Sequence, residues 1–221
     1  MQILKDRLSI DFMGRRNIAL IMSGVLLVVA IGSLLTRGLN FGIDFTGGTL
    51  IEVGYPQAAE LAEVRGILQE NGYTQAQAQH FGTSRDVLIR IPPSNEKASV
   101  KLSDDIMAAL RSGNPDVEMR RVEFVGPQVG EELTEQGGLA IIYALIGILI
   151  YIMLRFHARF APGAVAALIH DVVIVIGVFS LLQLEFDLTV LAALLAVIGY
   201  SLNDTIVVFD RIRETFRKMR K

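Results

Sequence analysis

The sequence contains no cysteine and no tryptophan, and only three of its 221 residues are histidines. Without cysteine the chain can form neither a disulfide nor a thiolate metal site, although this absence does not identify the redox compartment. The histidines are His80, His157 and His170. No two of them lie close enough in sequence to suggest a paired metal site, so we expect no metal.

The short motifs of hydrolases and nucleotide motors are also missing. Neither HExxH nor GxxxxGK[ST] occurs, so we expect neither a hydrolytic site nor a bound cofactor. The segment between the first two apolar runs has no basic stripe with interleaved aromatic residues. We therefore expect no binding of nucleic acid.

Four long apolar runs dominate a sequence that is 52% hydrophobic. They cover residues 18–35, 138–154, 164–184 and 188–209. Each is long enough to span a hydrocarbon core of roughly 30 Å. Because backbone groups in lipid must be satisfied within the segment, we predict four transmembrane helices.

The first run has an alternative interpretation as a cleaved signal sequence. Arg15 and Arg16 precede it, and Ala30-Ile31-Gly32 is a small-x-small triplet of the kind found at cleavage sites. The apolar run continues past this triplet, which favours a transmembrane helix.

The basic residues predict the orientation of the four spans. They gather before the first span, between the second and third, and after the fourth, whereas the link 185–187 has none. With the three basic stretches on the cytoplasmic side, the spans alternate without conflict. We therefore predict a multi-pass membrane protein with both ends cytoplasmic and residues 36–137 on the outer side of the membrane.

The two predicted cytoplasmic ends have amphipathic patterns. After the fourth span, residues 210–221 are basic and continue an apolar stripe of Phe209, Ile212, Phe216 and Met219. This pattern is typical of a helix lying along the membrane surface, in contact with lipid. Residues 1–17 are predicted to do the same, and residues 155–163 form a cytoplasmic loop.

Residues 36–137 are long enough for a small domain with its own core. Strand patterns at 50–55, 76–81, 87–91 and 117–125 alternate with helical patterns after Pro56 and Ser94. The apolar phase of the last strand shifts near Arg120-Arg121, as a β-bulge would cause. The predicted order is βαββαβ, so we expect an α+β, ferredoxin-like domain.

Two glycine motifs flank this domain. Gly47-Gly48 permits a turn with positive φ before the first strand, and no lysine or following helix supports a phosphate cradle. Gly126-Pro127 leads from the last strand toward the second span. It suits either a hinge that transmits movement or a passive linker.

Polar residues lie inside the last two spans, as His170-Asp171 and Asn203-Asp204. An ionised carboxylate in mid-span costs about 2.5–3.5 kcal/mol on insertion scales, so such residues usually face the bundle or a water-filled path. With a rise of 1.5 Å per residue, Asp171 lies roughly 10 Å and Asp204 roughly 8 Å from the cytoplasmic ends of their helices. Both acids are thus predicted at similar depth on antiparallel neighbours.

Tyr200 and Ser201 precede Asp204 by four and three residues, so their hydroxyls lie on its face of the helix. A carboxyl that gains a proton on one side and loses it on the other would convert a gradient into conformational change. We therefore predict a proton pathway that consists of Asp204, Asp171, His170, Asn203, Tyr200 and Ser201. The alternative is that these acids only join helices or reach toward the interface. For Asp210, beside Arg211, we expect a solvated ion pair.

Four stretches of the sequence resemble the SecF branch of the SecD/SecF family. They are GIDFTGGT at 42–49, VEFVGP at 122–127, HDV at 170–172 and IGYSLNDTIVVFDRIRE at 198–214. Both branches resemble the RND superfamily of proton-driven exporters, and the resemblance runs over nearly the whole chain.

The resemblance implies a subunit that acts with SecD, beside the Sec translocon channel and its associated membrane subunits. Such subunits use proton-motive force to help translocating unfolded polypeptides complete their passage across the membrane. It also implies that the acid matched by Asp204 belongs to the proton path. The alternatives are an RND-type exporter of small molecules and a passive assembly subunit.

The chain departs from the family pattern in one respect. The resemblance implies six spans, of which this sequence contains four, and an arginine in the fifth span as the partner of Asp204. Two interpretations stay open: the chain is a fragment that lacks the last two spans, or its sequence ends early.

Overall fold

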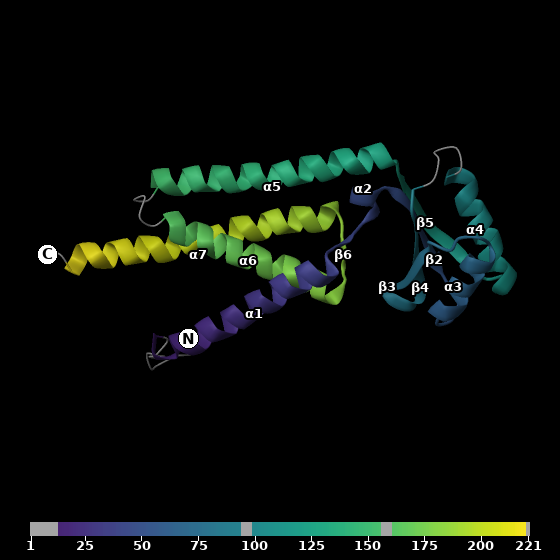
Figure 1. Cartoon of the computed structure of the whole chain (residues 1–221), viewed down its shortest axis with the longest axis horizontal. Helices are drawn as coiled ribbons and strands as arrows, with labels where there is room; N and C mark the ends of the chain where they lie inside the picture. The colour runs from purple at the N-terminus through teal and green to yellow at the C-terminus, as the bar shows by residue number, and fades with distance from the viewer. Residues whose placement is uncertain (1–12, 94–98, 156–160, 220–221) are drawn as a thin grey trace, which may run out of the picture. The chain divides into compact units, whose positions relative to one another are not determined.

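The computed structural model describes residues 13–93, 99–155 and 161–219, and four of its helices are long and apolar enough to cross a membrane (Figure 1). They are α1 (Arg16–Arg37), α5 (Pro127–Arg155), α6 (Ala161–Leu182) and α7 (Leu188–Met219). Most of their side chains are exposed, as expected for surfaces that face lipid. The predicted membrane protein with four spanning helices and a small mixed region is confirmed.

Two helices extend beyond the apolar runs that predicted them. Helix α5 begins at Pro127, where the missing N–H of proline suits a first helical position, and not at residue 138. Helix α7 continues through Met219 because no glycine or proline interrupts it after Tyr200. The predicted separate helix over 210–221 is therefore, in the described residues, the end of α7.

Some predicted segments fall where the structure is not described. The predicted amphipathic pattern at the N-terminus lies mostly in residues 1–12, and the predicted loop 155–163 includes residues 156–160. The predicted cap at Ser94 is outside the described residues as well.

The chain divides into two compact units. The helical unit contains residues 1–40, 149–184 and 194–221, and the mixed unit contains residues 41–148 and 185–193. Within the helical unit, α1 packs closely against α6.

The contacts between these two helices occur at a constant separation in sequence. Ala30 lies opposite Gly177, and the buried hydroxyls of Ser33 and Ser180 are 2.9 Å apart. Both pairs have the same spacing in sequence, so α1 and α6 run in parallel. Small residues at the contact let the two backbones approach.

The mixed unit is built on a four-stranded sheet in the order β3-β4-β2-β5, with every neighbouring pair antiparallel. Its strands are β2 (Gly48–Gly54), β3 (Gln77–Phe81), β4 (Thr83–Ile91) and β5 (Glu118–Val125). Helix α3 (Leu61–Glu70) follows β2, and α4 (Ser99–Gly113) follows β4. The predicted order βαββαβ is thus present, while the ferredoxin-like assignment stays a prediction.

The sheet and its two helices enclose the main hydrophobic core. Ile51 and Ile89 from the central strands meet Leu68 of α3 and Ile106 of α4, and all four side chains are almost completely buried. Alternate residues of β2 and β4 contribute to this core, as the period of two in the sequence predicts.

Two local details depart from, or refine, the expected pattern. Helix α3 begins at Leu61 and not near Pro56, because the backbone of Tyr55 and Ala59 still bonds to the start of β4, at 2.8 and 2.9 Å. The register between β2 and β5 shifts at Arg120, where one extra residue is inserted. The β-bulge predicted at Arg120-Arg121 is confirmed.

Candidate functional site

Two carboxylic acids in the helical unit line one groove. Asp171 comes from α6, and Asp204 comes from α7. The groove has a volume of about 720 Å³, and its other walls are mostly apolar, including Ala167, Val197 and Val208. The structure thus brings together the two acids that the sequence predicted at similar depth.

Asp171 is held by hydrogen bonds on both of its oxygens. The Ser201 hydroxyl donates to Asp171 Oδ2 at 2.5 Å, from the neighbouring helix α7. His170 Nδ1 lies 2.9 Å from Asp171 Oδ1. Asp171 therefore has a fixed orientation, and the predicted role of His170 as its neighbour has a geometric basis.

A third helix joins this network. Ser23, on α1, has its hydroxyl oxygen 2.6 Å from His170 Nε2. Ser23, His170, Asp171 and Ser201 therefore form a continuous chain of hydrogen bonds across α1, α6 and α7. Sequence reasoning missed Ser23, because a single serine in an apolar helix carries no local signal of its partner.

Asp204 differs from Asp171 in its surroundings. Its carboxylate is exposed and makes no hydrogen bond or ion pair with any residue in the described ranges. Ser201 shares its helix face, as predicted, but the Ser201 hydroxyl is committed to Asp171. Tyr200 also lines the groove and is 77% exposed.

Two other polar residues of α7 lie away from the groove. Asn203 is exposed and is not among the groove's lining residues. Asp210 forms an ion pair with Arg155 at the end of α5, at 2.8 Å. The expected pair of Asp210 with Arg211 is wrong, because Arg211 instead bonds Glu214 one helical turn further on.

The two glycine motifs lie against each other within the mixed unit. Gly47 and Gly48 both have positive φ, at 68° and 125°, and a Cβ on Gly48 would lie 2.4 Å from the carbonyl oxygen of Ile91. A Cβ on Gly130 would lie 2.8 Å from the backbone nitrogen of Gly47. The backbone approaches these glycines too closely for a side chain, so the turn predicted at Gly47-Gly48 requires glycine.

Gly126 and Pro127 occupy the junction between β5 and α5. The Gly126 carbonyl accepts a hydrogen bond from the Gly130 N–H at 3.0 Å, which closes the first turn of the helix that Pro127 begins. Their predicted action as a hinge stays a prediction.

Asp44 in the first motif has a specific partner. Its Oδ2 accepts a hydrogen bond from the Leu188 N–H at 3.0 Å, at the first residue of α7. An acid at this position satisfies an otherwise unpaired backbone donor. Asp44 lies in the short helix α2 (Ile43–Thr46), which follows the two-residue strand β1 (Asn40–Phe41) and precedes β2. The ring of Phe45 in α2 stacks on the ring of Phe186.

The charges of Arg90 and Glu185, outside the spans, interact near this motif. Burial raises the pKa of Glu185, in the two-residue strand β6 (Glu185–Phe186), and the charge of Arg90 opposes that rise. Burial likewise lowers the pKa of Arg90, whose guanidinium donates to the Thr46 hydroxyl at 2.7 Å.

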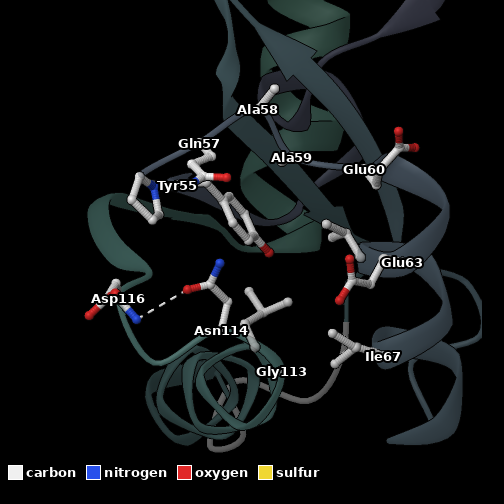
Figure 2. Close-up of a pocket in the computed structure, with 13 residues that line it drawn as sticks. Tyr55, Gln57, Ala58, Ala59, Glu60, Glu63, Ile67, Gly113, Asn114 and Asp116 are labelled. Carbon is white, nitrogen blue, oxygen red and sulfur yellow. Dashed lines mark hydrogen bonds between the residues drawn. The ribbon is translucent and has the colours of Figure 1, made fainter.

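A second hollow, of about 360 Å³, lies in the mixed unit between α3 and the end of α4 (Figure 2). The side chains of Tyr55, Glu63, Ile67 and Asn114 converge on it. Burial, with a contribution from the Glu63 charge, raises the pKa of Tyr55 to about 12.

Comparison with known protein families gives two matches. Residues 105–221 match the profile of "Protein export membrane protein SecD/SecF, C-terminal", and residues 32–59 match "SecD/SecF GG Motif". The second match includes Gly47 and Gly48, and the first includes the whole acid-lined groove.

Individual relatives agree with these matches. The chain is 53% identical over its full length to the protein translocase subunit SecF of Vibrio alginolyticus and covers 70% of that protein. It is 55% identical over 213 residues to the SecF subunit of Pseudomonas aeruginosa, which is 96% of this chain and 69% of the relative.

A solved structure has a similar fold. The crystal structure of SecDF, a translocon-associated membrane protein from Thermus thermophilus, superposes with a TM-score of 0.82 and 35% identity. The match covers 97% of this chain and 29% of the SecDF chain, so this chain spans less than a third of that protein's length.

Proposed function

The chain belongs to the SecD/SecF family of protein export membrane proteins, and on that premise we propose that it acts with SecD to drive late steps of protein export by proton movement. In this proposal the protein has no hydrolytic step of its own. Energy comes from the transmembrane potential, at roughly 2.3 kcal/mol for each charge moved through 100 mV.

The observation that carries the proposal is the groove shared by Asp171 and Asp204. Acids inside spanning helices are costly and usually mark a path for ions or protons. Asp171 already accepts two hydrogen bonds, whereas Asp204 has no partner among the described residues. Because the resemblance to SecF places the acid matched by Asp204 on the proton path, we assign proton uptake and release to Asp204, with Asp171 as its fixed neighbour.

The proposed setting follows from the distribution of charge. Basic residues flank the spans on one side, including Arg155 and Arg211, and the link 185–187 has no lysine or arginine. This pattern supports an inner-membrane protein with both ends of this chain in the cytoplasm. Residues 36–137 would then face the periplasm, where the translocating polypeptide emerges from the Sec channel.

The replacement Asp204→Asn tests this proposal in the full-length protein with SecD. The amide keeps the shape of the side chain but cannot exchange a proton. We expect export to fall to the rate measured without a proton gradient, with assembly with SecD unchanged. The measurement is translocation of a secreted protein into membrane vesicles, with and without an imposed gradient.

Asn203→Ala is the matched control, because Asn203 is adjacent in sequence but lies outside the groove. It should keep gradient-dependent export. If Asp204→Asn exports at the wild-type rate under the gradient, the proposal is wrong, and a passive assembly role becomes the better account. Loss of small-molecule efflux with unchanged protein export would favour an RND-type exporter.

A further inference from the structure

The contact between Ser23 and His170 lies in the tightly registered interface of α1 and α6. Ser23–His170, Ala30–Gly177 and Ser33–Ser180 all have the same spacing in sequence, so the three contacts follow one line along parallel helices. A Cβ on Gly177 would lie only 2.2 Å from the Ala30 Cβ, so the backbones are as close as these residues allow. The Ser23 hydroxyl is therefore held at a fixed place beside the imidazole.

The chemistry of the hydrogen-bonding groups determines which atoms of this network carry protons. When Asp171 is ionised its oxygens only accept hydrogen bonds, so His170 Nδ1, 2.9 Å from Asp171 Oδ1, then carries a proton and donates it. In neutral His170 the other nitrogen, Nε2, then has a lone pair, and the Ser23 hydroxyl donates to it at 2.6 Å. The partner on one ring nitrogen thus fixes the state of the other.

We propose that Ser23 is a positioning residue that anchors the imidazole of His170 in the orientation in which Nδ1 faces Asp171, and so keeps Asp171 oriented toward the groove it shares with Asp204. A hydroxyl suits this task because it rotates. It donates to Nε2 when His170 is neutral and accepts from Nε2–H when His170 is charged. The hydrogen bond therefore survives a change in the charge of the ring.

Other polar groups near the network bond Asp171 directly or line the groove. From α7, Ser201 bonds the second oxygen of Asp171, and the titratable side chains of Tyr200 and Asp204 line the same groove. Among the described residues of α1, Ser23 is the one in hydrogen-bond contact with His170. Ser23 therefore acts on Asp171 only through the imidazole.

The alternative is that Ser23 merely joins two helices, as polar residues in membranes often do. Ser33 provides the comparison, because its hydroxyl bonds Ser180 in the same interface and has no link to His170. A structural role would make Ser23 and Ser33 equivalent. A positioning role makes them differ in the tautomer of His170.

The test uses two isosteric variants of the full-length protein with SecD. Ser23→Thr keeps the hydroxyl, and Ser23→Val has the same shape without it. We expect ¹⁵N NMR of labelled histidine to show the Nδ1–H form of His170 in the wild type and in Ser23→Thr. In Ser23→Val we expect a mixture of both tautomers, because the ring that has lost its anchor can turn Nδ1 away from Asp171. The His170 signal is identified by its loss in His170→Gln.

Gradient-driven export gives the functional readout. We expect Ser23→Val to lower it roughly fivefold, the rate equivalent of about 1 kcal/mol, which is a typical net contribution of one hydrogen bond. Ser23→Thr should restore export, and Ser33→Ala should change neither the tautomer nor export. An unchanged His170 tautomer in Ser23→Val would overturn the inference, as would an equal tautomer change in Ser33→Ala.

This inference rests on the proposed proton path, yet the two fail separately. If Asp204→Asn leaves gradient-driven export intact while Ser23→Val alters the tautomer, the proposed function is wrong and the positioning of His170 stands. If Asp204→Asn abolishes export while the tautomer in Ser23→Val is unchanged, only the role of Ser23 is refuted.

Discussion

Two aspartates in the same groove illustrate how surroundings divide one chemical group into two roles. Asp171 accepts hydrogen bonds from Ser201 and His170, so its position is set from two sides. Asp204 has no such partner in the described part of the chain. The structure therefore fixes the position of Asp171, while the role proposed for Asp204 rests on its place in the groove and on the family resemblance.

Tyr55 provides a prediction for a single residue of the mixed unit. Its pKa is raised from 10.0 to about 12, first by burial and then by the charge of Glu63. Between these two values the folded unit keeps a proton that the unfolded chain loses. The resulting stability is fully present below about pH 10 and is lost as the pH rises through 12.

Ultraviolet titration of tyrosinate in the wild type and in Tyr55→Phe measures this difference directly. The group missing from the variant should titrate near pH 12. Glu63→Gln is the control: it should lower the midpoint of Tyr55 but leave it above 10, because burial is the larger cause. A midpoint near 10 in the wild type would contradict the partly buried position of Tyr55.

At the scale of elements, the close contact of α1 with α6 is the strongest constraint in the helical unit. Gly177→Ala would place a Cβ 2.2 Å from the Ala30 Cβ and 2.7 Å from its Cα. We expect this to force the helices apart and to cost about 1–3 kcal/mol, the usual range for overpacking. Adding Ala30→Gly should recover part of the loss, because the contact with the Cα remains.

Disulfide formation between Ser33→Cys and Ser180→Cys measures the separation of the helices. The 221-residue sequence has no native cysteine that could interfere. The native hydroxyls of Ser33 and Ser180 are 2.9 Å apart. Cross-linking should be efficient in the parent, weak with Gly177→Ala, and intermediate with both changes. Equal cross-linking in all three proteins would show that the interface is not closely packed.

Sequence patterns predicted the elements better than their contacts. Hydropathy predicted the four spanning helices, and the phase of apolar residues predicted the bulge at Arg120. These signals are local, since they depend on neighbours within a few residues. Helix ends were less certain: proline at Pro127 begins α5 well before its apolar run.

The sequence predicted the two acids of the candidate site but not the hydrogen bonds that connect them to other helices. Asp171 and Asp204 are conspicuous because a carboxylate inside an apolar run is costly. Ser23 and His170 are 147 residues apart, and no local pattern pairs them. The partners of Asp44 and Asp210 were missed for the same reason, because each lies on a segment distant in sequence.

For the whole molecule, family membership and the groove point to the same process. The chain covers 70% of the SecF relative from Vibrio alginolyticus, and the matched region contains both aspartates. The central claim is that Asp204 changes its protonation when the gradient across the membrane changes.

Infrared difference spectroscopy of the full-length protein with SecD in sealed vesicles tests this claim most directly. Imposing and then collapsing a proton gradient should produce a carboxyl band that reverses with the gradient and is absent in Asp204→Asn. A spectrum in which no gradient-dependent carboxyl band is removed by Asp204→Asn would contradict the account.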